Sequence, residues 1–338
     1  MISIDELIYF KAYYNFAFIK IRNMSTSNTV VFIDTVHSVL QERLTQANYK
    51  CLDASNKSKA ECKELLSGAV GIVVRSRFPM DADFLSHAKK LKFIARSGAG
   101  MENIDISYCQ ERGIQLYNAP EGNRNAVAEH ALGMLLSLFN NLKKGDLEIR
   151  EGVWDREGNR GVELDGKTVG IIGYGNNGAA FAKKLRGFDV DILAYDKYKT
   201  GFSNEFVKES SLSDLYENAD VLSLHIPQND ETMFLVNDEF LSLFKKPIYL
   251  INLSRGKIVR TAALRKAIQE DRVLGACLDV LEFEKASFEN IFSGEMPEDF
   301  EFLLKSNKVI LSPHVGGWTK ESYFKLSNVL ADKILGEQ

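Results

Sequence analysis

The stretch TVGIIGYGNNGAAFAKKLRGFDVDILAYD, residues 168–196, contains three glycines in the spacing G-x-G-x-x-G. Gly173, Gly175 and Gly178 directly follow an apolar run and open a helical pattern. In such a turn the first glycine permits the sharp change of direction, the second lets a pyrophosphate approach the backbone, and the third allows close helix–strand packing. The first helical turn would offer its N–H groups and the positive end of its dipole to the phosphates. The stretch therefore predicts a strand–turn–helix unit that binds a dinucleotide.

The acidic residue that ends this stretch indicates which dinucleotide is bound. Asp196 lies 18 residues after Gly178 at the end of the next predicted strand, where a carboxylate can accept hydrogen bonds from ribose hydroxyls. Its charge would repel a 2′-phosphate, so NAD is favoured over NADP, although Lys197 stands beside it. Another glycine-rich segment, SGAG at 97–100, lacks the third glycine and an acidic partner strand.

Apolar runs that alternate with helical patterns surround this unit on both sides. The later runs are apolar on both faces, as expected of parallel strands covered by helices on each side. The alternation predicts two doubly wound α/β domains, a flavodoxin-like substrate domain and a Rossmann NAD-binding domain, joined through a long helix expected at about 123–150. The predicted strands are 29–34, 69–76, 91–98, 114–120, 167–173, 189–196, 220–227, 248–254, 273–281 and 308–314.

The predicted domain bounds leave an extension at the N-terminus. Residues 1–23 are rich in aromatics, but they lack a basic start and a cleavage site, and they are too short and polar to span a bilayer. Met24 resembles a natural domain start. We expect an extension at 1–23, a discontinuous substrate domain at 24–121 and 315–338, and an NAD-binding domain at 122–314.

Composition excludes several classes of function. The chain has 338 residues and a net charge of −4, which argues against a general nucleic-acid binder. Its four cysteines form no CxxC pair and lie near no histidine cluster, so we expect buried thiols in a reducing cytoplasm and no metal site. No membrane association is expected.

Three charged segments lie at the ends of predicted strands, the edge at which open α/β sheets bind ligands. They carry Arg255, then Asp279, Glu282 and Glu284, and finally His314. An arginine can hold a carboxylate in two hydrogen bonds and polarise a carbonyl. A histidine can take a hydroxyl proton while a hydride leaves the same carbon, and a carboxylate bonded to the imidazole fixes its tautomer. Spacing alone does not choose between Glu282 and Glu284, which share a strand face.

The ordered motifs GIIGYGNNG (170–178), NLSRG (252–256), LDVLEFE (278–284) and SPHVGG (312–317) resemble the D-isomer-specific 2-hydroxyacid dehydrogenase family. The resemblance covers nearly the whole chain from about residue 28. It implies that Arg255, Glu284 and His314 are catalytic and that Asp279 contacts the nicotinamide amide. It further implies NAD contacts from Tyr174, Asn176, Asn177, His225, Ile226, Pro227, Leu253, Ser254, Gly316 and Gly317, and a substrate-carboxylate loop formed by Ser97, Gly98, Ala99 and Gly100.

The chain also departs from the family pattern and contains other histidines. Lys285 stands where the family usually has proline, and the segment from there to Asn307 is long. The other histidines are read as structural: His37, His87 and His130 on helices, and His225 at a strand end beside the adenosine.

Within the family, IVVRSRFP (72–79) and RSGAGMENID (96–105) most resemble phosphoglycerate dehydrogenases, which act in serine synthesis. The resemblance implies oxidation of 3-phosphoglycerate. Arg75 and Arg77 lie at the end of a predicted strand, and we expect one of them, Arg75, to pair with the substrate phosphate, unless it instead bonds loop carbonyls. It also implies a homodimer formed through the 123–150 helix and no regulatory domain after residue 338. Two alternatives stay open: a glyoxylate/hydroxypyruvate or other 2-ketoacid reductase, and an NAD-sensing binding protein similar to related corepressors.

Overall fold

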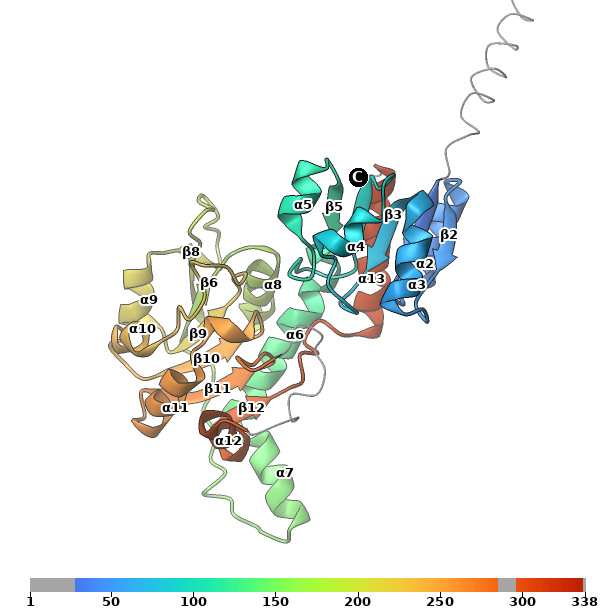
Figure 1. The fold of residues 1–338 in the computed structure, drawn as a ribbon. Helices are drawn as coiled ribbons and strands as arrows, with labels where there is room; N and C mark the ends of the chain where they lie inside the picture. Colours follow the sequence, from blue (N-terminus) through green and yellow to red (C-terminus); the bar gives the residue numbers. More distant parts are fainter. Residues whose placement is uncertain (1–27, 285–295, 337–338) are drawn as a thin grey trace, which may run out of the picture. The chain divides into compact units, whose positions relative to one another are not determined.

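The computed structural model describes residues 28–284 and 296–336, which group by their contacts into two compact units (Figure 1). Unit 1 contains the described residues up to Ala95 together with Ile104–Tyr117, and unit 2 contains Arg96–Asn103 and the chain from Asn118 onward. The extension predicted at 1–23 lies outside the described residues. The domain bounds expected from the sequence stay a prediction.

Unit 1 is built on a five-stranded parallel sheet in the order β2-β1-β3-β4-β5. This is the strand order of a flavodoxin-like fold, so the predicted class of this unit is confirmed. The strands β1 and β3 are buried along their whole length, because apolar residues occupy both faces. The bounds are β1 Thr29–Phe32, α2 Ser38–Gln46, β2 Lys50–Asp53, α3 Lys59–Leu65, β3 Ala69–Val74, α4 Ala82–Ser86, β4 Phe93–Arg96, α5 Ile106–Glu111 and β5 Gln115–Asn118.

Unit 2 holds a seven-stranded parallel sheet in the order β12-β11-β10-β9-β6-β7-β8. The chain turns back at β6, with β7 on one side and β9 on the other, so the topological switch point of a Rossmann fold falls at the predicted dinucleotide turn. The predicted fold class is confirmed here too. The bounds are β6 Thr168–Ile172, β7 Asp191–Tyr195, β8 Lys208–Glu209, β9 Val221–Leu224, β10 Ile248–Asn252, β11 Val273–Leu278 and β12 Val309–Leu311.

The helices of unit 2 cover both faces of its sheet. Successive side chains of a strand point to opposite faces, and accordingly Ile171 and Ile172 belong to two separate apolar clusters. The cluster around Ile171 includes buried side chains of α6 (Pro120–Phe139) and α8, and the cluster around Ile172 includes those of α9, α10, α11 and α12. The bounds are α8 Asn176–Lys184, α9 Leu212–Asn218, α10 Asp238–Ser242, α11 Thr261–Gln269, α12 Glu298–Lys305 and α13 Lys320–Leu335.

The prediction of one continuous helix at 123–150 is wrong. Helix α6 spans Pro120–Phe139 and α7 spans Leu142–Arg150, and Asn141 between them has a φ of 50°. Asparagine tolerates this left-handed conformation better than most residues, so the chain ends one helix and starts another there. Helix α6 packs against α8 and α13, whereas α7 buries none of its residues and extends away from the sheet of unit 2 (Figure 1).

Two further features bear on expectations from the sequence. Within the long segment 285–307, residues 285–295 lie outside the described residues, and α12 forms part of the remainder. None of the helices in the described part of the chain combines the length and apolar character needed to cross a membrane.

Candidate active site

The turn after β6 has the close backbone packing that its glycines predict. Gly173 has a φ of 93°, and a Cβ atom there would collide with the carbonyl group of His225 at the end of β9. A Cβ atom on Gly178 would collide with the carbonyl oxygen of Gly173, so α8 starts in direct contact with the end of β6. Gly175 has open space around the position of its missing Cβ atom. Two of the glycines are therefore needed for packing, and the middle one leaves room for a ligand to reach the backbone.

The start of α8 fits the phosphates of a dinucleotide. Gly175 precedes the helix, and no side chain of the described residues caps the first N–H groups. The Oδ1 atom of Asn177 is buried and has no hydrogen-bond partner among the described residues. Arg124 of α6 donates to Asn176 Oδ1 (3.3 Å). A hollow of about 730 Å³ adjoins the turn, and its lining includes four cationic side chains, from Arg124, Lys183, Lys199 and Lys325.

The carboxylate of Asp196 is fixed against this turn. Its Oδ2 atom accepts the N–H of Tyr174 (2.8 Å), and its Oδ1 atom accepts the N–H groups of Tyr198 and Lys199 (3.0 Å each). Lys197 instead pairs with Glu231 (2.8 Å), so the ammonium group beside Asp196 has its own counter-ion. The carboxylate thus stands at the end of β7, where the sequence predicts the contact with the ribose.

His225 lies beside the turn in a neutral state. Burial lowers the pKa of its imidazole to about 4, and its Nε2 atom lies 2.9 Å from Ser223 Oγ. Its ring tilts against Phe181 of α8 with 5.4 Å between the centroids. Ile226 and Pro227 follow on the same loop, and Pro227 is exposed. The structural role expected for His225 agrees with these contacts, and the adenosine contact stays a prediction.

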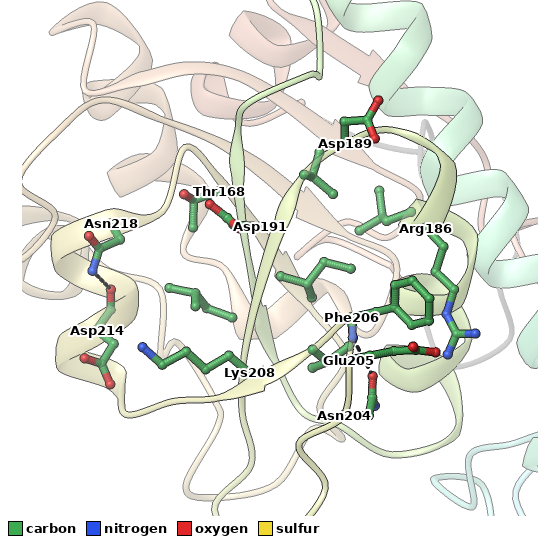
Figure 2. A pocket seen from close by; sticks show the side chains of 15 residues that line it. Thr168, Arg186, Asp189, Asp191, Asn204, Glu205, Phe206, Lys208, Asp214 and Asn218 are labelled. Atoms are coloured by element: carbon green, nitrogen blue, oxygen red, sulfur yellow. Dashed lines mark hydrogen bonds between the residues drawn. The ribbon is translucent and has the colours of Figure 1, made fainter.

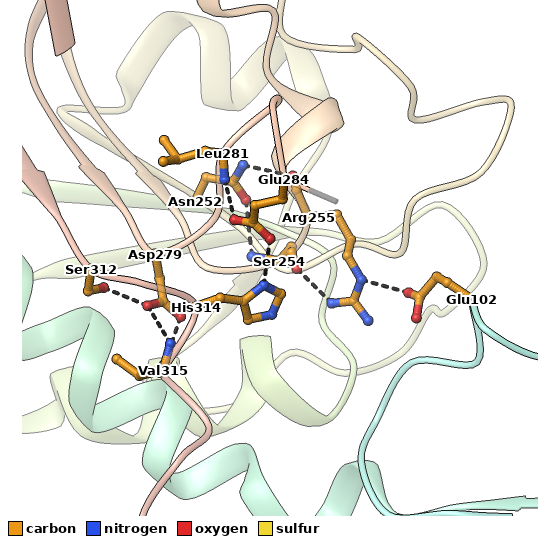
Figure 3. A network of polar contacts seen from close by, with 11 residues as sticks. Glu102, Asn252, Ser254, Arg255, Asp279, Leu281, Glu284, Ser312, His314 and Val315 are labelled. Atoms are coloured by element: carbon orange, nitrogen blue, oxygen red, sulfur yellow. Dashed lines mark hydrogen bonds and ion pairs between the residues drawn. The ribbon is translucent and has the colours of Figure 1, made fainter. Parts of the chain in front are cut away.

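Figure 3 shows the acid–base pair that the sequence motifs suggest. The Nδ1 atom of His314 lies 2.7 Å from Glu284 Oε2, and the other oxygen of Glu284 accepts the N–H of Leu281 (2.6 Å). The backbone turn that contains Glu284 therefore holds its carboxylate, and the carboxylate orients the imidazole of His314. Because Nδ1 faces the carboxylate, proton exchange with a ligand falls to Nε2.

The structure distinguishes Glu284 from its neighbour Glu282. The Oε2 atom of Glu282 accepts the N–H of Thr261 (2.7 Å), the first residue of α11. Glu282 thus satisfies an N–H group at the start of a helix, whereas Glu284 is hydrogen-bonded to His314. The geometry agrees with the choice of Glu284 made from the family spacing.

Asp279 holds the turn that carries His314. Its Oδ1 atom accepts from Ser312 Oγ (2.5 Å) and from the N–H of Val315 (2.9 Å), and its Oδ2 atom accepts from the N–H of Gly316 (2.7 Å) (Figure 3). The N–H of His314 also donates to the backbone carbonyl of Asp279 (2.8 Å). His314 has a φ of 55°, and these bonds stabilise that strained conformation. The predicted contact of Asp279 with a nicotinamide amide stays a prediction.

Arg255 follows β10 and is fixed at both ends. Asn252 Nδ2 donates to its backbone carbonyl (2.9 Å), and its Nη1 atom donates to the carbonyl of Ser254 (2.6 Å). Its Nε atom donates to Glu102 Oε1 (2.6 Å) (Figure 3). Glu102 belongs to the segment Arg96–Asn103, which groups by contacts with unit 2. Leu253, the residue between Asn252 and Ser254, is buried.

The predicted substrate-carboxylate loop precedes Glu102. Ser97 is buried, the carbonyl of Gly98 accepts the N–H of Ala119 (2.9 Å), and the carbonyl of Ala99 accepts Asn118 Nδ2 (2.6 Å). These contacts fix the loop, and its role in binding a substrate stays a prediction.

Arg75 lies at the end of β3 in unit 1. Its backbone N–H donates to Asp34 Oδ2 (2.5 Å). The neighbouring Arg77 uses its guanidinium group to bind the carbonyls of Ile33 (3.0 Å), Ala54 (3.1 Å) and Lys57 (2.6 Å). Arg77 thus binds loop carbonyls, and the phosphate contact of Arg75 stays a prediction.

Three side chains in contact with the site were not predicted as parts of it. Glu102 pairs with Arg255, Ser312 donates to Asp279, and His130 Nε2 lies 2.9 Å from Ser312 Oγ. Ser312 stands in the SPHVGG motif two residues before His314, and Glu102 stands in the RSGAGMENID motif two residues after Gly100.

A separate hollow lies at the amino ends of strands in the unit 2 sheet, whereas the candidate site lies at the carboxyl ends (Figure 2). It has a volume of about 600 Å³, and its lining includes Thr168 and Asp191, which begin β6 and β7. No predicted site residue lines it among the described residues. Open α/β sheets bind ligands at the carboxyl ends of their strands, so this hollow does not belong to the candidate site.

The candidate site is thus assembled at one edge of a Rossmann sheet. The dinucleotide turn follows β6, Arg255 follows β10, Asp279 and Glu284 follow β11, and His314 follows β12. A dinucleotide turn next to an arginine and a histidine–carboxylate pair defines the class of nicotinamide-dependent dehydrogenases. Residues 132–316 match the model of the D-isomer specific 2-hydroxyacid dehydrogenase NAD-binding domain, and the chain belongs to this family. Its cofactor is NAD.

Relatives and solved structures of this family agree in fold but differ in the activity that they are named for. The D-3-phosphoglycerate dehydrogenase of Archaeoglobus fulgidus is 36% identical over 266 residues, 78% of this chain and 48% of that protein. The hydroxypyruvate reductase of Thermotoga maritima is 33% identical over 281 residues, 82% of this chain and 88% of that protein. The D-lactate dehydrogenase of Aquifex aeolicus, solved with NAD and lactic acid, is 28% identical and has a TM-score of 0.76 over 91% of this chain and 96% of that one. The chain spans about half the length of several phosphoglycerate dehydrogenases that it matches.

Proposed function

We propose that this protein is an NAD-dependent oxidoreductase that transfers a hydride between NAD and a D-2-hydroxy acid. The observation that carries the proposal is the 2.7 Å contact between His314 Nδ1 and Glu284 Oε2, two strands away from Arg255 at the edge that bears the dinucleotide turn. A proton carrier, a group that orients it and a carboxylate-binding cation are the protein groups that this reaction requires.

Three side chains have separate roles in the proposed reaction. His314 takes the hydroxyl proton in oxidation and returns it in reduction, through Nε2. Glu284 holds the ring in one tautomer and stabilises the imidazolium ion while the proton resides there. Arg255 binds the substrate carboxylate and polarises the neighbouring carbonyl. The turn after β6 and Asp196 would hold NAD, which would supply the hydride acceptor in oxidation and, as NADH, the hydride donor in reduction.

A matched pair of glutamate variants tests these roles. Glu284→Gln should lower kcat by about 100- to 10,000-fold, the contribution of a positioned acid–base group, while the Kd for NADH changes less than threefold. Glu282→Gln should lower the melting temperature through α11 and leave kcat within about threefold of the wild type. Steady-state kinetics and NADH fluorescence titration measure both quantities. Equal kcat values for the two variants would contradict the assigned roles.

For the substrate, we favour 3-phosphoglycerate, which would place the enzyme in serine synthesis in the cytoplasm. The identity with phosphoglycerate dehydrogenases and the position of Arg75 after β3 support this choice. The similarity to a hydroxypyruvate reductase supports the alternative of a glyoxylate/hydroxypyruvate reductase almost equally. A panel of both acids with NAD and NADP separates them. Rapid reduction of hydroxypyruvate without turnover of 3-phosphoglycerate would refute our preference.

A binding protein that senses NAD without catalysis is the rival from another class. The hydrogen-bonded pair of His314 and Glu284 argues against it, because a sensor has no need of a proton carrier. Binding of NAD without turnover of any acid in the panel would favour the sensor.

We also propose a homodimer formed through α6 and α7. Leu142, Leu147, Ile149 and Trp154, on α7 and just after it, expose 59%, 49%, 54% and 79% of their surface. Such a group of exposed apolar side chains on a projecting helix is typical of a subunit interface. Light scattering should give twice the chain mass, and Leu147→Glu should give a monomer. A monomeric wild type would contradict the proposal.

A further inference from the structure

The guanidinium group of Arg255 already holds a carboxylate from its own chain. Glu102 Oε1 accepts the Nε–H of Arg255 at 2.6 Å, which is a short, charge-assisted hydrogen bond. Arg255 exposes 26% of its side chain and Glu102 exposes 46%, so the pair lies at the surface of the site, within reach of a solute.

The backbone around Gly100 is shaped for this ion pair. A Cβ atom at Gly100 would collide with Arg255 Nη2 and with both carboxylate oxygens of Glu102. The two charged groups therefore rest on the loop predicted to receive the carboxylate of the substrate. A larger residue at position 100 would have to displace the ends of both side chains, so the ion pair occupies the space left by the missing side chain of Gly100.

The electrostatics of the site favour the charged form of Glu102. Burial raises the pKa of its carboxyl group, but the charge and hydrogen bond of Arg255, with a smaller contribution from the Arg96 guanidinium, outweigh this and lower the pKa below its usual value. Glu102 is thus an anion at neutral pH and neutralises the charge of Arg255.

On the basis of the function proposed above, we propose that Glu102 is a selectivity residue that competes with the substrate for Arg255. Its carboxylate stands in for the substrate carboxylate in the unliganded site, and a 2-keto or 2-hydroxy acid must displace it. Neutral carbonyl compounds carry no carboxylate to replace Glu102 at the guanidinium group, so the ion pair favours acids over aldehydes and ketones.

Removal of the charge at position 102 tests the competition. Glu102→Gln retains the size of the side chain but binds Arg255 more weakly. If Glu102 competes, the KM for the 2-keto acid and the Kd for oxamate, a carboxylate probe, should both fall by about two- to fivefold at saturating NADH, the effect expected of a partly exposed ion pair. The kcat should stay within about twofold, and Glu102→Asp, which restores the charge, should return both constants toward the wild type.

Glu298→Gln is the matched control. It removes another arginine–glutamate pair, in which Arg265 Nη2 lies 2.8 Å from Glu298 and the arginine exposes 24% of its side chain. This pair joins α11 and α12, so its loss should leave KM and the Kd for oxamate unchanged.

The outcomes separate the inference from the proposed function. If the wild type turns over an acid or binds oxamate, an unchanged or increased Kd in Glu102→Gln would overturn the competition and would mean that Glu102 only positions Arg255. If the wild type neither turns over an acid nor binds oxamate, the proposed function fails and the inference fails with it.

Discussion

The imidazole of His225 should make the stability of unit 2 depend on pH. An unfolded histidine has a pKa of about 6.5, whereas burial lowers that of folded His225 to about 4. Between these values the unfolded chain binds a proton that the folded chain does not, so stability falls as the pH decreases. The contribution is fully present above pH 6.5 and fully lost below about pH 4. At about 1.4 kcal/mol per pKa unit, the 2.5-unit difference gives about 3 kcal/mol.

The measurement compares the wild type with His225→Gln, which keeps a side chain able to hydrogen-bond Ser223. Urea unfolding without NAD, followed by circular dichroism from pH 4.5 to 7.5, gives the free energy of unfolding of each protein. The wild type should lose stability on acidification more steeply than the variant, by most of the 3 kcal/mol. A histidine NMR titration should place the pKa of the ring near 4. Parallel stability curves, or a ring that titrates near pH 6.5, would refute the reasoning.

Three further substitutions test the cofactor turn and the His314 turn. Gly178→Ala should raise the Kd for NADH at least tenfold and cost about 1–3 kcal/mol of stability, because the added methyl group collides with the Gly173 carbonyl. The control Gly187→Ala places its methyl group in open space and should leave the Kd for NADH, measured by fluorescence titration, unchanged. Asp196→Ser should raise the NADP-to-NAD ratio of kcat/KM at least tenfold, since the charge that repels a 2′-phosphate is gone, and an unchanged ratio would mean that another group selects the cofactor. Asp279→Asn should lower kcat/KM about 10- to 100-fold, because the amide nitrogen cannot accept the N–H groups of the His314 turn; activity within twofold of the wild type would contradict this role.

The sequence predicted the strands that have apolar runs, and it missed the edge strands β2 and β8. Strand β2 exposes both end residues and β8 contains only two residues, so neither has a continuous apolar run. The break between α6 and α7 was missed because it depends on the backbone of Asn141, and a left-handed asparagine leaves no mark in apolar spacing. The periodicity of apolar residues thus predicts the elements that pack into the core, and it does not detect a local turn between two helices.

The site was predictable to the extent that strand topology determines it. The carboxyl ends of parallel strands meet at one edge, so Arg255, Glu284 and His314 could be expected near one another. The pairing of Glu102 with Arg255 could not be expected, because their positions differ by 153 in the sequence and no periodic pattern connects the two segments. The sequence placed Glu282 and Glu284 on one strand face, but β11 ends at Leu278 and both glutamates lie in the turn that follows it. Only the position of α11 shows that Glu282 serves a helix instead of the imidazole.

The acid–base group of the site comes from one segment of the chain, whereas its ion pair joins two distant segments, and this difference affects how each can change during evolution. Glu284, His314 and their supporting residue Asp279 all lie within residues 279–316, so this group can be inherited as one block. The ion pair between Arg255 and Glu102 joins distant segments, and a change at one position alters the fitness of the residue at the other. Among descendants of this gene, positions 102 and 255 should therefore vary together.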